Sequence, residues 1–263
     1  MKVIFILDSH YFNENHFFLM LQHFQKQYRE KILLSGLIPF DKTTISQKLS
    51  SNRLLLKDYL SGRADLLQIF KEIGHPDYDI ISTFEKKARN AGFKVSLKLY
   101  DTLDQALSME SSYSDLLACS SDMPDKGLAV IRDCQCPVLF LPYGMHDIKS
   151  IVLPMQEGIE FIAWKQFKWI FPELSKEIPV SLLAPFPSND AETEKEKLLV
   201  EYLITNFSNS GIVNYLTDFY QEFCLLTDSM DKPLVIASIR KDLDGQDKFI
   251  NFILNRKMPV FLA

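Results

Sequence analysis

The sequence lacks two features that would define whole classes of protein. It has no excess of basic residues, because 29 Lys and Arg stand against 34 Asp and Glu, a formal net charge of −5. It also has no dense basic cluster, which argues against a DNA- or RNA-binding protein. No segment reaches about eighteen consecutive apolar residues, the length of a candidate transmembrane helix, so we expect no contact with a membrane.

A signal peptide and a cysteine framework are also missing. The apolar run from Val3 to Leu7 ends at Asp8 and is too short for the core of a signal peptide, so we expect a cytoplasmic protein. Four cysteines in such a chain are interpreted as reduced thiols. Cys134 and Cys136 form a Cys-x-Cys pair, but the further ligands that a zinc site requires are absent, so no metal is expected.

Catalytic motifs are absent as well. The sequence contains neither the Gly-x-Ser-x-Gly elbow of a serine hydrolase nor the Gly-x4-Gly-Lys-(Ser/Thr) phosphate loop. His16 and His23 would lie nearly two turns apart on a helix, which favours surface or boundary positions over metal binding. No set of nucleophile, acid and base is recognisable, so we do not expect an enzyme.

One short pattern is present twice. Cys136 to Leu141 reads Cys-Pro-Val-Leu-Phe-Leu, and Met258 to Ala263 reads Met-Pro-Val-Phe-Leu-Ala, 122 residues further on. Each copy closes a stretch of about domain length, which indicates an internal duplication. We predict two domains, residues 1–145 and residues 146–263, the first with an insertion near residues 41–75.

Strands and helices alternate in both halves. Strands are expected at residues 3–7, 32–38, 95–100, 116–120 and 137–141, then at 151–153, 180–184, 212–216, 234–238 and 260–262. Among the helices, residues 159–170 are expected to bury Ile162 and residues 191–207 to bury Leu198. This alternation predicts an α/β fold of two tandem doubly wound units, each a five-stranded parallel sheet flanked by helices.

The two units resemble the universal stress protein family. The resemblance rests on the Pro-Val endings, which read Cys-Pro-Val in the first half and Met-Pro-Val in the second, and on two further segments. Val3 to Ser9 is similar to the family's first strand and its Asp-(Gly)-Ser, and Ser114 to Ser121 is similar to its Ala-Asp-Leu-Ile-Val-Met-Gly-Ser. The resemblance covers both halves of the chain and implies a tandem member of the family. It also implies that the final strands of the halves pair within one chain as a pseudo-dimer, with a homo-oligomer or a protein partner as a further expectation.

The family's phosphate-binding loop is not present in either half. Nucleotide-binding members carry Gly-x2-Gly-x9-Gly-(Ser/Thr) after the fourth strand, where glycines let backbone N–H groups approach a triphosphate. Ser120 and Met123 stand at the first two glycine positions. The separation from Ser120 to Cys136 is 16 residues and that from Ser238 to Met258 is 20, against about 25 in such members. The resemblance therefore implies that neither half binds ATP in the family's usual way.

A crevice would remain at the carboxyl ends of the first and fourth strands, where doubly wound sheets bind ligands. Its candidate lining residues in the first half are Asp8, Ser9, Ser120, Ser121 and Asp122. The resemblance implies that an aspartate at the position of Asp8 contacts the adenosine part of a bound nucleotide. The alternative is that Asp8 and Ser9 cap the following helix.

In the second half Met155 stands at the position of that aspartate, followed by Gln156 and Glu157. Arg240 and Lys241 would either hold an anion or remain solvated loop charges.

These observations lead to two main hypotheses. The first is a non-catalytic protein of the universal stress type, a stress-response or regulatory scaffold without a cofactor and without the usual ATP site. The alternative is an adenine-nucleotide sensor that binds ATP or AMP in the crevice near Asp8 and Ser120. A third, an enzyme of the wider nucleotide-binding α/β group, lacks the phosphate loop and the acid–base pair it would need.

Overall fold

The structure is a computed structural model that describes residues 1–27, 31–39, 43, 47, 65–144, 147–155, 161–207, 209–216, 218–238 and 246–263. It divides into two compact units, Met1–Cys136 and Pro137–Ala263. The sequence placed the boundary after residue 145, but the division precedes the first Pro-Val strand. This strand belongs to the second unit because it pairs with another strand of that unit. The expected insertion at residues 41–75 lies largely outside the described residues.

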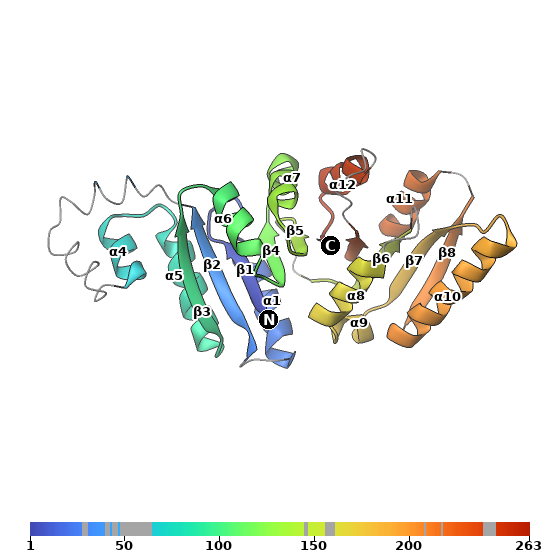
Figure 1. Cartoon of the computed structure of the whole chain (residues 1–263), viewed down its shortest axis with the longest axis horizontal. Coiled ribbons are helices and arrows are strands. Elements are labelled where there is room, and N and C mark those ends of the chain that lie inside the picture. Colours follow the sequence, from blue (N-terminus) through green and yellow to red (C-terminus); the bar gives the residue numbers. More distant parts are fainter. Residues whose placement is uncertain are drawn as a thin grey trace. The chain divides into compact units, whose positions relative to one another are not determined.

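The first unit contains four strands in the order β3-β2-β1-β4 (Figure 1). Their pairings are parallel, as the sequence predicted. The strands are β1 Lys2–Ile6, β2 Leu33–Pro39, β3 Lys94–Tyr100 and β4 Leu116–Ser120. The helices are α1 Glu14–Gln27, α4 Leu66–Glu72, α5 Tyr78–Asn90, α6 Leu103–Ser111 and α7 Pro124–Asp133.

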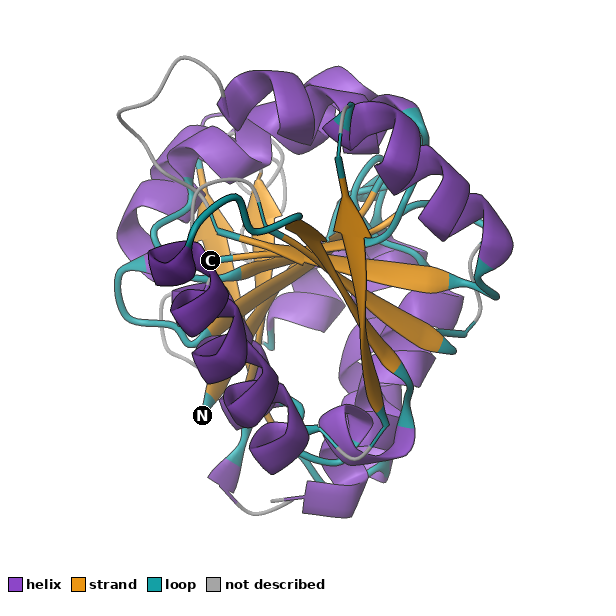
Figure 2. Ribbon diagram, turned by 90° about the vertical axis from the view of Figure 1, so that its right-hand side faces the viewer, coloured by secondary structure: helices purple, strands orange, loops and turns teal. Residues whose placement is uncertain are grey.

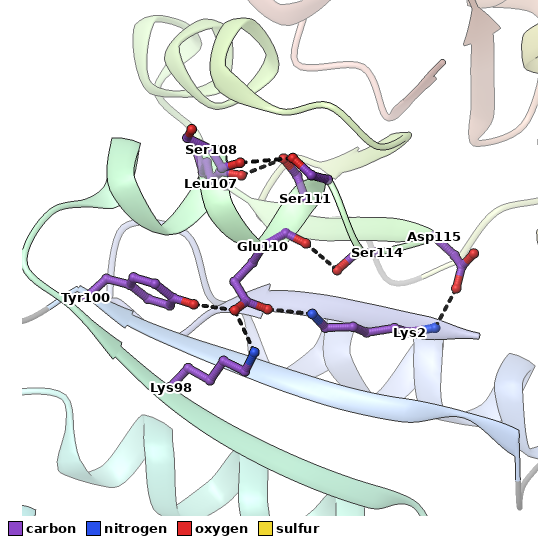
Figure 3. A network of polar contacts seen from close by, with 10 residues as sticks. Lys2, Lys98, Tyr100, Leu107, Ser108, Glu110, Ser111, Ser114 and Asp115 are labelled. Carbon is purple, nitrogen blue, oxygen red and sulfur yellow. Dashed lines mark hydrogen bonds and ion pairs between the residues drawn. The ribbon is translucent and has the colours of Figure 1, made fainter.

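Aromatic side chains join the sheet of the first unit to the helices on one of its faces. The ring of Phe17 on α1 lies 4.9 Å from that of Phe84 on α5 and 5.1 Å from that of Phe5 on β1, measured between centroids. All three residues are buried. Helices α6 and α7 contact each other, and Figure 3 shows α6 over the opposite face of the strands. Both faces of a parallel sheet are thereby covered.

The second unit contains the strand order β5-β10-β9-β6-β7-β8. Its strands are β5 Val138–Leu141, β6 Ser150–Pro154, β7 Val180–Pro185, β8 Ser210–Tyr215, β9 Pro233–Ala237 and β10 Val260–Leu262. Strand β10 pairs in parallel with β9 and antiparallel with β5, so that Phe261 lies opposite Leu139. These are the two Pro-Val strands of the repeat. The helices are α8 Phe161–Ile170, α9 Leu174–Glu177, α10 Asp190–Asn206, α11 Phe219–Ser229 and α12 Gln246–Asn255.

Two core residues expected in these helices are exposed instead. Ile162 on α8 is 56% exposed and Leu198 on α10 is 58% exposed, so both expectations were wrong. On each helix the adjoining residue, about 100° further round, faces the core. These adjoining residues are Ala163 and Leu199, which are both buried, and the buried Trp164 also packs against the ring of Tyr202.

The α/β fold class predicted from the sequence is confirmed. Strands of each unit twist progressively between layers of helices (Figure 2), as expected of sheets built from βαβ crossovers. No helix within the described ranges is both long and apolar enough to span a bilayer.

Candidate functional site

The loop after β1 turns back over the end of β4. Within it, the carbonyl oxygen of Asp8 accepts hydrogen bonds from the backbone N–H groups of Tyr11 (3.0 Å) and Phe12 (2.9 Å). The carbonyl oxygen of Tyr11 in turn accepts from the N–H of Ser120 at 2.7 Å. Because β1 and β4 pair in parallel, the predicted residues that follow them lie at the same edge of the sheet.

The carboxylate of Asp8 stabilises its own loop. It accepts a hydrogen bond from the N–H of His10 at 2.7 Å. Helix α1 is capped instead by Asn13, whose side-chain oxygen accepts from the N–H groups of Asn15 (3.0 Å) and His16 (3.2 Å). The interpretation of Asp8 as the cap of the following helix was therefore wrong, because Asp8 caps a turn that precedes this helix.

A second carboxylate contacts the same loop from the start of α5. The Oδ1 atom of Asp77 accepts from the N–H of Ser9 at 3.3 Å. Burial raises the pKa of Asp77 above its ordinary value, and the nearby charge of Asp8 raises it further. No motif in the sequence pointed to Asp77, which immediately precedes α5. Its proximity to Asp8 makes this edge of the sheet electronegative, which opposes the binding of a phosphate group.

Ser120, the residue at the first glycine position, is held by a histidine. Its Oγ lies 2.6 Å from Nδ1 of His16, and both residues are only 3% exposed. The expectation of a surface or boundary position for His16 was wrong. His16 lies one helical turn before the buried Met20 on the inner face of α1, and this spacing was the available signal. A serine nucleophile must be reached by its substrate, and this buried pair is not accessible, so its role is structural.

The turn between β4 and α7 is short. Strand β4 ends at Ser120 and α7 begins at Pro124. Within the turn, Oγ of Ser121 accepts from the N–H of Met123 at 3.0 Å, and Ser121 is buried. Asp122 and Met123 are exposed. The segment where nucleotide-binding members carry a glycine-rich loop is therefore a tight turn that leads directly into a helix.

Tyr11 connects the loop after β1 to α7. The ammonium group of Lys126 lies 5.8 Å from the centroid of the Tyr11 ring, within the range of a cation–π contact. Burial raises the pKa of the Tyr11 hydroxyl, and the charge of Asp8 adds to the effect. The phenol is therefore protonated at neutral pH.

The corresponding edge of the second unit has different chemistry. Met155 follows β6, and its backbone N–H donates to Leu183 O at 2.8 Å while its carbonyl oxygen accepts from the Tyr215 hydroxyl at 3.3 Å. Ser238 follows β9, and its buried Oγ has no hydrogen-bond partner within the described part of the chain. The other residues considered from the sequence lie outside the described residues: Gln156, Glu157, Arg240 and Lys241.

A separate polar cluster lies between α6 and the sheet of the first unit (Figure 3). One oxygen of the Glu110 carboxylate accepts from Lys2 Nζ at 2.5 Å, and the other accepts from Lys98 Nζ at 2.5 Å and from the Tyr100 hydroxyl. Burial alone would raise the pKa of Glu110, but these hydrogen bonds outweigh it and lower the pKa to about 2. The backbone N–H of Lys2 also donates to Asp115 at 2.6 Å.

This cluster has the character of a structural contact. The Glu110 residue is 7% exposed, and three donors already occupy both of its carboxylate oxygens. Its donors come from β1 and β3, so it fixes α6 across several strands. No sequence pattern indicated it, because the Lys2–Glu110 pair spans 108 positions.

The cysteines of the first unit are buried. Cys134 Sγ lies 3.5 Å from Cys136 Sγ, and Cys119 is 4% exposed. Burial raises the pKa of Cys119, and the hydrogen bond between Cys134 and Cys136 together with burial raises that of Cys136. Within the described residues, no group of three or more His, Cys, Asp or Glu side chains is placed to hold a metal ion.

The fold is similar to that of universal stress proteins of known structure. A universal stress protein from Archaeoglobus fulgidus DSM 4304 matches with a TM-score of 0.64 at 11% identity, covering 100% of this chain and 95% of that protein. A functionally unknown protein from Pseudomonas aeruginosa PAO1 matches with a TM-score of 0.58 at 10% identity, covering 100% and 92%. No family model and no curated protein matches the sequence. The likeness confirms the predicted fold.

Proposed function

We propose that this chain is a non-catalytic protein of the universal stress type that acts as a regulatory scaffold without the usual ATP site. The observation that carries the proposal is the buried hydrogen bond between Ser120 Oγ and Nδ1 of His16. It places a side chain of the protein itself at the end of β4, where a phosphate group would otherwise approach the backbone.

The surroundings of this hydrogen bond support the same function. A triphosphate needs several converging backbone N–H groups, but the N–H of Ser120 donates to Tyr11 O and that of Met123 donates to Ser121. Helix α7 begins at Pro124, which supplies no N–H group. Asp8 and Asp77 add negative charge at the same edge and oppose a polyphosphate.

A thermal-shift titration tests this function. The protein is titrated with ATP and with AMP, each with and without magnesium, to millimolar concentration. A ligand present at about a hundred times its dissociation constant stabilises a protein by about 2.7 kcal/mol, a shift that such an assay readily detects. We expect no shift with either nucleotide.

Two variants test whether a thermal shift depends on Asp8. Asp8→Ala removes the carboxylate that would contact adenosine, and Asp190→Ala removes an exposed carboxylate of the second unit. A nucleotide-dependent shift that is present in the wild type and in Asp190→Ala but absent in Asp8→Ala would refute the proposal and establish the adenine-nucleotide sensor. Mass spectrometry of small molecules released from the denatured protein would identify any other ligand.

A further inference from the structure

Strand β8 has one side without a strand partner. It is the last strand of its sheet and pairs with β7 alone in the part of the chain that the structure describes (Figure 1). An edge strand presents backbone N–H and C=O groups on which another strand can add. The edge is therefore a potential interface, and its residues determine which kind of strand it favours.

The register of β8 identifies the outward-facing backbone groups. The N–H of Val180 donates to Asn209 O at 2.8 Å, and the N–H of Phe186 donates to Tyr215 O at 2.9 Å. Bonds from a strand to one neighbour involve alternate residues, so residues 209, 211, 213 and 215 bond to β7. The N–H and C=O groups of Ser210, Ile212 and Asn214 consequently point away from the sheet.

The side chains of β8 carry no charge. Its sequence is Ser-Gly-Ile-Val-Asn-Tyr, and natural proteins protect sheet edges with charged residues, proline or bulges. The edge strand of the first unit, β3, illustrates such protection, because it contains Lys94 and Lys98. Lys98 points inward to Glu110. Strand β8 contains neither a charged residue nor a proline.

Apolar side chains extend the edge onto α10. The Nδ2 atom of Asn214 donates to Glu196 Oε1 at 2.9 Å, which shows which side of α10 lies over β8. Val200 and Ile204 follow Glu196 at successive intervals of four residues and so lie on the same side of the helix. Ile204 is 69% exposed and Val200 is half-buried. Ile212 points to this face of the sheet, because it has the same parity as Asn214.

We propose that β8 is a self-association surface on which β8 of a second copy of this chain pairs antiparallel. A two-fold axis at Ile212 places Ser210 opposite Asn214 of the other copy, and each opposed pair exchanges two backbone hydrogen bonds. The two Ile212 side chains then form an apolar cross-strand pair, and the exposed side chains of Ile204 flank it.

Charge favours a second copy over a different partner. Two β8 strands bring no like charges together, whereas two β3 strands would bring lysines together. Strand β8 itself also offers no charged side chain that would select an acidic or basic peptide. Pairing of identical strands needs no such selection, because two-fold symmetry makes the uncharged edge complementary to itself.

Sedimentation velocity over micromolar to hundreds of micromolar protein tests the proposal. We expect a reversible monomer–dimer equilibrium in the wild type. Ile212→Lys should raise the dimer dissociation constant by about tenfold or more, because it places two like charges opposite each other. Leu225→Lys, a matched substitution at a 59% exposed leucine of α11, should leave it unchanged.

A second variant distinguishes a loss of strand pairing from a loss of folding. Asn214→Pro removes one outward N–H group and the side-chain bonds to Pro185 O and Glu196, but none of the backbone bonds to β7. It should therefore weaken the dimer while circular dichroism shows a folded protein. A wild type that remains monomeric throughout would overturn the proposal and leave the edge to a strand of a different protein. If the folded Ile212→Lys and Asn214→Pro variants dimerise as strongly as the wild type, the proposal is also overturned, because the interface would then lie elsewhere.

Discussion

The Glu110 cluster provides a quantitative test of how the first unit is held together. Glu110→Gln keeps the shape of the side chain but removes the charge that attracts the ammonium groups of Lys2 and Lys98. Those groups lie 2.5 Å from the carboxylate oxygens and are partly buried, with side-chain exposures of 17% and 39%. The variant therefore leaves two ammonium groups near a neutral amide.

The magnitude follows from the titration of the carboxyl group. Its pKa falls from 4.5 to about 2 on folding, and one pKa unit corresponds to about 1.4 kcal/mol. The ionised carboxylate thus contributes about 3 kcal/mol to stability at neutral pH. Because the folded pKa is the lower one, this contribution is present above about pH 5 and is lost as the pH falls toward 2.

Urea denaturation followed by circular dichroism measures the difference. At pH 7 we expect Glu110→Gln to lower the free energy of unfolding by about 3 kcal/mol, and the difference should shrink as the pH falls below 5. Glu173→Gln is the control, because its 3.6 Å ion pair with Lys176 is exposed, and it should change stability by less than about 0.5 kcal/mol. Equal stability of Glu110→Gln and wild type at pH 7, or a loss independent of pH, would show that the ionised Glu110 carboxylate does not stabilise the first unit.

Three further outcomes are expected. His16→Ala should lower the free energy of unfolding by about 2–3 kcal/mol in urea titrations, because it leaves a cavity and deprives the buried Ser120 hydroxyl of its partner; unchanged stability would contradict the assigned contact. Gly36→Ala should cost about 1–3 kcal/mol in the same assay, since its new Cβ would lie 2.4 Å from Cδ1 of Leu7. A neutral result there would mean that Leu7 moves freely. Cys224, which is only half-buried, should be the one thiol that reacts rapidly with a chromogenic disulfide reagent before unfolding. Rapid reaction of a second thiol would show that the buried cysteines become accessible.

Local sequence patterns were sufficient for the secondary structure and the fold class. The apolar run at Val3 to Leu7 corresponds to β1, and the final strand, Val260–Leu262, was placed at the residues observed. Such segments are buried on both faces, so apolarity alone identifies them. The Pro-Val repeat indicated the duplication, but it did not mark the division between the units, because both copies lie in the second unit, as β5 and β10.

Contacts between distant segments could not be predicted from local sequence patterns. The sequence placed Asp8 and Ser120 at one edge of the sheet, but the choice of His16 as the partner of Ser120 depends on how α1 packs. Likewise, Leu198 and Leu199 are adjacent leucines, and only the packing of α10 determines which one is buried. Rotation of a helix about its axis is a tertiary property.

We propose that the chain's own residues close the edge of the sheet beside Ser120 to adenine nucleotides. Isothermal titration of ATP with magnesium into the purified protein measures this most directly. We expect no saturable heat of binding up to millimolar nucleotide. Saturable binding that is lost in Asp8→Ala would contradict it and would show that a nucleotide binds despite the turn at Ser121 and the buried His16–Ser120 hydrogen bond.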